Sequence, residues 1–334
     1  MTAEATIRPG RDEDAEGFIS LIGAAWSEFP GCVVDVDGEM PELRALATCF
    51  EEAGGALWAA EQDGRIVGVV ATRPLRHDEA YEICRMYVAR GARGTGLAQR
   101  LLRLAEGWAR DAGAARMVLW TDTRFEAAHR FYEKHGYVRQ GAIRILDDLS
   151  KSLEFRYAKP ARGLVVEALD AAAAASAERR LSRILVDCVA VGGSVPFFPP
   201  LAPERAREVW RRVSAEVAAG TRVLLAAWRD GALVGTVQID LGTPENEPHR
   251  AGIEALLVDP AARGTGVGRA LMQRAEQAAR RLGRSLLTLE TRADELAERL
   301  CRDLGWQEAG RVPGYALNAD RTPADAVFLW KRLG

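Results

Sequence analysis

The sequence has few cysteines, and they are not arranged to hold a disulfide framework or a zinc ion. They are five in number, with no C-x-x-C pair and no histidine cluster: Cys32, Cys49, Cys84, Cys188 and Cys301. Disulfide scaffolds pair their cysteines, and zinc sites bring several cysteine or histidine ligands close together. We therefore expect reduced thiols and no metal site.

Long apolar runs and a strong net charge are also absent. No stretch approaches the roughly 20 apolar residues of a membrane helix, and the alanine run at 171–175 is too short to span one. With 45 basic and 47 acidic residues, the formal charge of -2 gives no sequence-wide attraction to nucleic acid or anionic lipid. Residues 1–11 lack the order of a secretory signal. These features predict a cytoplasmic monomer or homodimer with a small-molecule partner, and neither nucleic acid nor membrane as a partner.

An internal repeat divides the chain into two similar halves. The turn Arg93–Gly96 recurs as Arg263–Gly266, an offset of 170 (263 minus 93). The segment Ala128–Tyr137 recurs as Ala297–Trp306, an offset of 169 (297 minus 128). Each half also places Asp-Gly between two apolar runs, which is the signature of a tight hairpin. Offsets that agree this closely indicate two copies of one architecture.

The division also follows from size, because 334 residues exceed the length over which one hydrophobic core keeps growing. Proline and glycine at 159–163 interrupt both helical and strand patterns. We expect an N-terminal domain at 5–160 and a C-terminal domain at 163–334. The second should open with a strand at 164–169 and a helix at 171–189.

In each half an apolar strand runs into the glycine turn, and apolar residues at helical spacing follow it. The strands are expected at Ile83–Val88 and Ile253–Val258. A helix that starts directly after such a turn presents unpaired backbone N–H groups and the positive end of its dipole. Glycine lets the backbone approach a bulky phosphate closely. The pattern therefore predicts two anion sites.

The spacing of the turn discriminates among phosphate ligands. Neither copy has the Gly-Lys-[Ser/Thr] of a nucleoside-triphosphate loop. Gln99 and Arg269 stand where a dinucleotide fingerprint has its third glycine. Both copies instead satisfy R-x-x-G-x-[G/A], the second ending in Gly268 and the first in Ala98.

Through these turns and the A-x-x-F-Y-x-x-x-G-Y segment that starts at Ala128, the sequence resembles the GNAT superfamily of N-acetyltransferases. The resemblance occurs twice, once in each half, and covers nearly the whole chain. The resemblance implies an α/β (α+β) fold, repeated once, in which a mixed, mostly antiparallel sheet is flanked by helices. The second half further resembles the tabtoxin resistance acetyltransferases, through Ser194–Leu201, Val234–Gln238, Pro248–Ala251 and Pro313–Ala316.

The resemblance implies acetyl-CoA as the cofactor, held mainly at the glycine turns and the strand ends before them. The implied cofactor-binding residues are Met86, Tyr87, Val88, Arg93, Gly94, Thr95, Gly96, Leu97, Ala98 and Tyr132 in the first copy, and Leu256, Leu257, Val258, Arg263, Gly264, Thr265, Gly266, Val267 and Gly268 in the second. A backbone N–H near Val88 or Val258 is expected to polarise the thioester carbonyl.

Acetyl transfer to an amine requires a base, because the attacking amine must be neutral. The resemblance implies a base on the strand entering the turn, where Glu82 lies six residues before Val88 and Glu254 four residues before Val258. Both numbers are even, so each carboxylate is expected on the same side of its strand as the valine. The alternative is a strand-end carboxylate in water or in a salt bridge.

The departing thiolate requires a proton, which a phenol can supply. Tyr132 matches the tyrosine that serves as general acid in many relatives, whereas Cys301 stands at the matching place in the second copy. Tyr315 could replace it there, or could be an ordinary core residue. This difference puts the activity of the second copy in doubt.

The remaining polar candidates are ambiguous. Asp122 and Glu290 could contact a cationic amine or merely end their strands, while His129 is expected on a helix surface and His249 in a loop. The sequence thus predicts acetyl transfer to a primary amine of a small molecule. The alternatives are a non-catalytic acetyl-CoA-binding or scaffolding role, for the second copy above all, and acetylation of protein amines.

Overall fold

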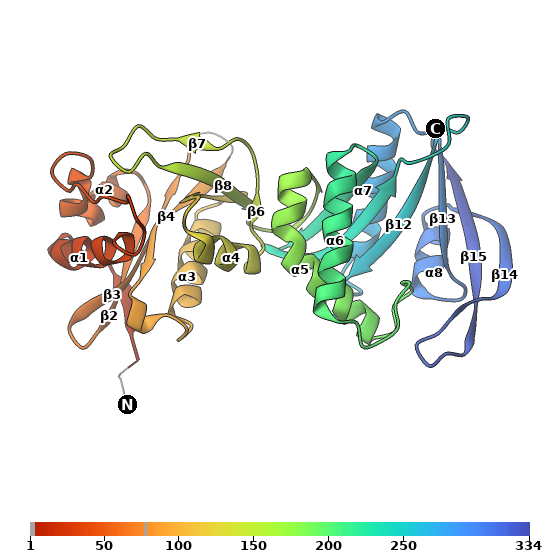
Figure 1. The fold of residues 1–334 in the computed structure, drawn as a ribbon, viewed down its shortest axis with the longest axis horizontal. Helices are drawn as coiled ribbons and strands as arrows, with labels where there is room; N and C mark the ends of the chain where they lie inside the picture. Colours follow the sequence, from red (N-terminus) through yellow and green to blue (C-terminus); the bar gives the residue numbers. More distant parts are fainter. Residues whose placement is uncertain (1–3, 77–78) are drawn as a thin grey trace. The chain divides into compact units, whose positions relative to one another are not determined.

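The computed structural model describes residues 4–76 and 79–334 and divides into two units. The first unit comprises the residues up to Tyr132 together with Arg139–Arg162, and the second comprises Glu133–Val138 and Gly163–Gly334. Each unit contains its own sheet with helices packed on it (Figure 1). No helix among the described residues is long and apolar enough to cross a membrane.

The first sheet has the order β1-β2-β3-β4-β5-β8-β6, with β7 paired to β8. Among the pairs whose register the structure describes, β4 with β5 is parallel and the others are antiparallel. The strands are β1 (Thr6–Pro9), β2 (Ala56–Gln62), β3 (Arg65–Pro74), β4 (Ala80–Val88), β5 (Arg116–Asp122), β6 (Val138–Arg139), β7 (Arg144–Ile145) and β8 (Leu153–Pro160).

The second sheet repeats this topology, with the order β9-β10-β11-β12-β13-β15-β14. In the described part of this sheet β12 with β13 is parallel and the other pairs are antiparallel. The strands are β9 (Leu164–Leu169), β10 (Arg222–Arg229), β11 (Ala232–Asp240), β12 (Arg250–Val258), β13 (Leu286–Arg292), β14 (Gln307–Leu317) and β15 (Pro323–Arg332). The two mixed, mostly antiparallel sheets confirm the expected fold class.

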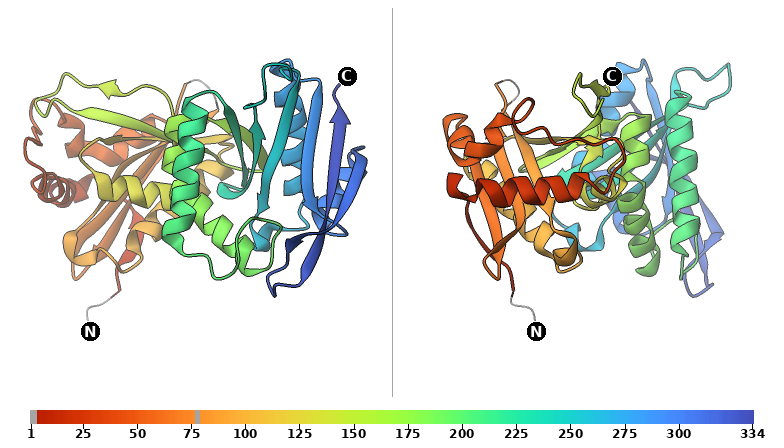
Figure 2. Two further views of the ribbon diagram at one scale, coloured as in Figure 1. Left: turned by 45° about the vertical axis from the view of Figure 1, so that its right-hand side comes forward. Right: turned by 60° about the vertical axis from the view of Figure 1, so that its left-hand side comes forward.

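Helices cover both faces of each sheet. In the first unit α1 and α2 pack on the face that carries Val69 and Ala71, while α3 packs against β3 and β4 from the other face. In the second unit α5 and α6 lie side by side on one face, and α7 lies on the other (Figure 2). The helices are α1 (Ala15–Trp26), α2 (Leu46–Glu52), α3 (Leu97–Asp111), α4 (Glu126–Lys134), α5 (Ala171–Ala190), α6 (Pro203–Ala218), α7 (Val267–Arg281) and α8 (Leu296–Asp303).

One glycine in each sheet lets the helix of the glycine turn approach closely. A Cβ at Gly68 on β3 would lie 2.9 Å from Cδ1 of Leu101 on α3. A Cβ at Gly235 on β11 would lie 3.1 Å from Cδ1 of Leu271 on α7. Any larger residue here would push the helix away from its sheet.

The parallel strands of each sheet separate before they end. Among the described residues, β4 pairs with β5 only over Ala80–Ile83, although β4 continues to Val88. Likewise β12 pairs with β13 only over Arg250–Ile253 and continues to Val258. Each sheet therefore has a strand segment that is free of one neighbour directly before the glycine turn.

A β-bulge lies in each of these segments. Arg85 on β4 and Ala255 on β12 have positive φ values of 49° and 47°, and the pairing registers with β3 and β11 shift there. A bulge inserts one extra residue and turns the following side chains to the opposite face of the strand. The bulges therefore decide which side chains face the candidate sites.

A buried ion pair behind each glycine-turn helix is also repeated. Lys159 Nζ on β8 lies 2.9 Å from Glu106 Oε1 on α3, and Lys331 Nζ on β15 lies 2.8 Å from Glu276 Oε2 on α7. Trp306 Nε1 donates a further hydrogen bond of 3.0 Å to Glu276. These ion pairs link α3 to β8 and α7 to β15 within each unit.

Candidate functional site

The two glycine turns have the same backbone geometry. Gly94 and Gly96 have φ values of 78° and 87°, and Gly264 and Gly266 have values of 74° and 87°. A Cβ at any of these four positions would meet no atom within 4 Å among the described residues, so the space in front of each turn is open. The strand–turn–helix arrangement predicted from the sequence is present in both units.

Each turn opens a long helix whose first amides point outward. Gly96 and Gly266 cap α3 and α7, each of 15 residues. The first helical bonds run from the amides of Arg100 and Ala270 to the carbonyls of these glycines, at 3.1 and 3.0 Å. The amides before them have no helical partner and, with the helix dipole, can hold a phosphate.

Side chains brace each turn from within. The hydroxyls of Thr95 and Thr265 donate to the carbonyls three residues earlier, at 2.8 and 2.7 Å. Leu97 and Val267 are buried, so only their backbone can face a cofactor. The contacts of these residues are therefore mostly structural, and the backbone is what the turns offer to a ligand.

A cavity of about 470 Å³ opens beside β4 in the first unit. Its lining brings together both residues predicted to carry the chemistry, Glu82 and Tyr132, with Met86 and Tyr87. Glu82 is 8% exposed, and its Oε2 accepts a hydrogen bond of 2.9 Å from Nε of Arg73. Arg73 lies opposite Glu82 in the register of β3 with β4. The carboxylate is therefore held in a salt bridge at the cavity wall.

The strand-parity prediction for the two glutamates is wrong. Glu82 lies opposite Arg73 and Val88 lies opposite Gly68, and these partners are five residues apart on β3. An odd separation places Glu82 and Val88 on opposite faces. The extra residue at the bulge of Arg85 reverses the alternation, which counting along the sequence cannot detect.

The same correction applies to the second unit. Glu254 lies opposite Gln238 and Val258 lies opposite Gly235, and these partners are three residues apart on β11. Glu254 and Val258 therefore face opposite sides. The bulge at Ala255 is the cause.

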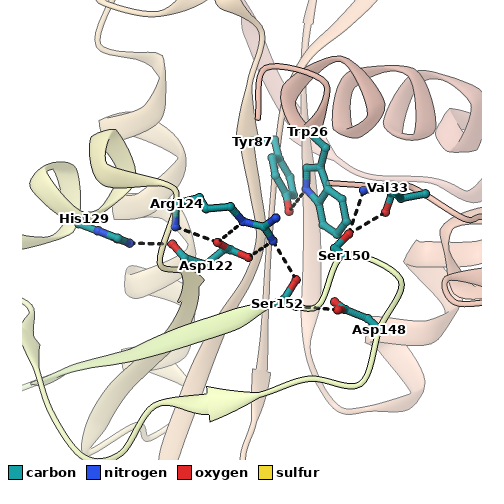
Figure 3. A network of polar contacts seen from close by, with 9 residues as sticks. All are labelled: Trp26, Val33, Tyr87, Asp122, Arg124, His129, Asp148, Ser150 and Ser152. Atoms are coloured by element: carbon teal, nitrogen blue, oxygen red, sulfur yellow. Dashed lines mark hydrogen bonds and ion pairs between the residues drawn. The ribbon is translucent and has the colours of Figure 1, made fainter. Parts of the chain in front are cut away.

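Tyr132 is a buried phenol at the wall of the first cavity. It is 7% exposed, and burial raises its pKa above the ordinary value, with a further contribution from nearby Tyr87. The hydroxyl of Tyr87 accepts a hydrogen bond of 2.9 Å from Nε1 of Trp26, so its own proton points elsewhere (Figure 3). Burial raises the pKa of Tyr87 as well. The cavity wall thus contains two protonated phenols.

Asp122 ends β5 in a dense polar network (Figure 3). Its Oδ1 and Oδ2 accept hydrogen bonds of 2.8 and 2.6 Å from the guanidinium of Arg124, which also reaches Ser152. Burial alone would raise the pKa of Asp122, but the bonds from Arg124 outweigh burial and lower it. The hydroxyl oxygen of Ser152 accepts the bond from Arg124, and the amide of Ser152 donates to Asp148 at 2.8 Å. Asp122 is therefore an ionised anchor that holds the loop before β8.

His129 is buried and is not the helix-surface residue that the sequence predicts. Its Nε2 lies 2.8 Å from the carbonyl oxygen of Asp122 (Figure 3). Its ring stacks on Tyr157 of β8. Burial lowers its pKa, which favours the neutral imidazole. The helical pattern of α4 alone does not predict the contact of His129 with β8, because β8 comes later in the sequence. His249 lies in a loop, as expected.

A larger cavity of about 1220 Å³ lies in the second unit, and Glu254 and Tyr315 both line it. Glu254 is exposed, and its Oε2 accepts a hydrogen bond of 2.6 Å from Arg222 on β10. Arg222 also bonds to Gln238, which lies opposite Glu254 in the register of β11 with β12. Both strand glutamates are thus paired with an arginine, but these arginines come from different strands.

The second unit does not reproduce the phenol of α4. Cys301 is fully buried in the core, does not line the described cavity, and burial raises its pKa to about 12. Tyr315 is half exposed, and its hydroxyl donates to Oε2 of Glu290 at 3.1 Å.

Sequence reasoning missed Arg73 and Arg222. The hairpin register could have located Arg73 opposite Glu82, whereas no local pattern marks Arg222.

Comparison with known families gives a match in each unit. Residues 19–137 and 193–306 match the model of the acetyltransferase (GNAT) family, and together they make up more than half of the chain. Each stretch includes one glycine turn and the strand before it.

Individual relatives match over shorter stretches. Rat N-acetyltransferase 8F1 is 28% identical over 125 residues, which are 36% of this chain and 54% of that protein. Human N-acetylaspartate synthetase is 37% identical over 89 residues, which are 27% of this chain and 30% of that protein. The chain thus spans about half or less of these relatives. A putative acetyltransferase from Salmonella typhimurium, solved with its cofactor acetyl-CoA, is 18% identical, with a TM-score of 0.44 over 52% of this chain and 95% of that one.

Proposed function

The chain belongs to the acetyltransferase (GNAT) family, and on this premise we propose that its first unit transfers an acetyl group from acetyl-CoA to a primary amine of a small molecule. One observation carries the proposal. The cavity that contains Glu82 and Tyr132 lies beside the end of β4 that β5 leaves without a partner, and this strand end leads through the short helix Arg90–Ala92 into the glycine turn. An acyl carrier held at the turn would extend along this strand end into the cavity.

In this proposal acetyl-CoA supplies the acetyl thioester, and the chain supplies orientation and proton transfer. The free amides around Gly96 hold the pyrophosphate. Glu82 accepts the proton of the attacking ammonium, directly or through a water molecule. Tyr132 donates its proton to the departing sulfur, and its raised pKa keeps that proton available at neutral pH. A backbone N–H near Val88 polarises the carbonyl.

The charge of the first cavity supports an amine acceptor. Three arginines line it, and each is paired with a glutamate of the lining: Arg73 with Glu82, Arg85 with Glu42, and Arg144 with Glu154. Of the other three carboxylates of the lining, Asp122 is paired with Arg124, which leaves Glu39 and Asp148 as the excess among the described residues. A lining with this excess of carboxylates attracts a cation and disfavours an anionic acceptor.

The second unit is proposed to bind acetyl-CoA without reproducing the proton donor of the first. Its glycine turn has the same backbone geometry, yet Cys301 is buried in the core. If it is catalytic, Glu254 and Tyr315 are the candidates for base and acid, because both line its cavity. The resemblance of this unit to tabtoxin resistance acetyltransferases remains a prediction, as do the cytoplasmic location, the monomeric or dimeric state and the choice of a small molecule over a protein amine.

Calorimetric titration of acetyl-CoA into the whole protein tests cofactor binding. Two sites are expected, the first abolished by Gly96→Glu and the second by Gly266→Glu, because a glutamate there fills the phosphate cradle and repels the charge of the phosphates.

Release of the CoA thiol with a panel of small primary amines then tests transfer. Glu82→Gln and Tyr132→Phe should each lower kcat by about 10²- to 10⁴-fold. Absence of binding, or transfer untouched by both substitutions, would overturn the proposal.

A further inference from the structure

The arginine that opens each R-x-x-G-x-[G/A] turn is already engaged by the protein. Nε of Arg93 donates to the carbonyl of Val88 at 3.2 Å, and its two terminal nitrogens donate to the carboxylate of Glu28 at 2.8 and 2.7 Å. In the second unit Nε of Arg263 donates to the carbonyl of Val258 at 3.4 Å. The same atom thus clamps the last residue of the preceding strand in both copies.

The other end of each guanidinium reaches the C-terminal end of the first long helix of its unit or the residues that directly follow it. Glu28 lies two residues beyond α1, and Arg263 contacts Sγ of Cys188, in the last turn of α5, at 3.8 Å. Trp26 at the end of α1 lines the first cavity, and Val189 beside Cys188 lines the second. In both copies the arginine therefore connects the cofactor turn to a wall of the adjacent cavity.

We infer that Arg93 and Arg263 are positioning residues that couple the cofactor turn to the acceptor wall, while the backbone amides of the proposed cofactor site hold the phosphates. A bidentate guanidinium–carboxylate pair is directional and charge-assisted, whereas a thiol is a weak acceptor. The coupling is therefore stronger in the first unit than in the second. The inference rests on the proposed site for acetyl-CoA at the turns, but not on the identity of the acceptor.

Hydrogen exchange on the whole protein, followed by mass spectrometry with acetyl-CoA as the probe, tests this coupling. The relevant amides are those of Ser27 and Phe29, which donate to carbonyls in the last turn of α1, and that of Cys32, which donates to the carbonyl of Phe29. Both side chains of the Arg93–Glu28 pair are partly exposed, so we expect acetyl-CoA to slow exchange here by about two- to fivefold. The slowing around Cys188 should be smaller.

Two variants separate coupling from phosphate binding. In Glu28→Gln and in Arg93→Gln, the affinity of the first site for acetyl-CoA should stay within about threefold of wild type, because the amides still hold the phosphates. The slowing at residues 27–32 should be lost in both. Glu126→Gln removes an exposed ion pair with Arg130 elsewhere in the same unit, and as the matched control it should preserve both affinity and slowing.

Three outcomes would overturn the inference. If Arg93→Gln weakens binding tenfold or more and Glu28→Gln does not, the arginine is a phosphate ligand. If the slowing persists in both variants, or if wild type binds acetyl-CoA with no slowing, the two regions are not coupled through this pair. Absence of binding to wild type would instead overturn the proposed function together with the inference.

Discussion

Replacement of Glu106 by glutamine should destabilise the first unit strongly, because it removes the carboxylate that pairs with Lys159 behind the glycine-turn helix. The two side chains are only 10% and 5% exposed, with 2.9 Å between Oε1 and Nζ. Removing one partner of a buried pair costs about 3–5 kcal/mol, since the other charge stays buried without compensation. For a unit of this size that corresponds to a fall in Tm of about 6–20 °C.

The size of the loss should depend on pH in a defined direction. Burial lowers the pKa of Lys159 from the ordinary value of 10.5, and Glu106 opposes that effect. Where a folded-state pKa is lowered, the unfolded chain binds the extra proton, so stability rises with pH up to the ordinary value. Glu106→Gln lowers the pKa of Lys159 further and so widens the pH range over which stability rises with pH. The loss of stability relative to wild type should therefore be larger at pH 7 than at pH 10.

Differential scanning calorimetry of the whole chain at these two pH values measures both effects. Glu276→Gln is the comparison in the second unit and should cost less, because Lys331 is 18% exposed and also donates to the carbonyl of Leu304 at 2.5 Å. The exposed pair of Glu126 with Arg130 supplies a control worth at most about 0.5 kcal/mol. A loss below about 1 kcal/mol for Glu106→Gln, or a deficit that grows with pH, would refute the reasoning.

Three further outcomes are expected. Gly68→Ala should lower stability by about 1–3 kcal/mol in urea unfolding, because the new Cβ would lie 2.9 Å from Leu101; an unchanged midpoint would show that α3 can shift freely. The rate of acetyl transfer should not fall between pH 7 and 10 through ionisation of Tyr132, whose pKa burial raises above 10; an alkaline loss in that range that Tyr132→Phe removes would contradict this. Cys301, fully buried, should resist a thiol-specific reagent in the folded protein and react only after unfolding, as a colorimetric thiol assay would show.

Local patterns in the sequence predict the parts of this architecture that depend on neighbouring residues. Asp63 and Asp230 begin the two hairpin turns with φ values of 50° and 49°, as the Asp-Gly pairs indicate. The glycine turns follow their strands and open helices because the strand pattern changes to helical spacing at that point. The expected helix at 171–189 is observed as Ala171–Ala190.

The features that sequence reasoning missed depend on contacts between distant segments. The bulges at Arg85 and Ala255 leave no mark in composition, because an extra residue in one strand is defined only by its partner strand. Arg222 reaches Glu254 from a strand two positions away in the sheet. His129 has the spacing of an exposed helical residue, yet β8 covers it. Contacts between elements that are distant in the sequence decided each of these cases.

The two copies keep the scaffold of the cofactor turn but not the lining of the cavity. Both have the positive-φ glycines, the bulge and the buried ion pair. In the lining, Leu257 takes the register position of Tyr87, and Cys301 matches Tyr132 in the repeat. Two copies with one shared reaction would be expected to keep both phenols. The loss of both from the second copy therefore argues that its cofactor turn serves a different acceptor, or a function without transfer.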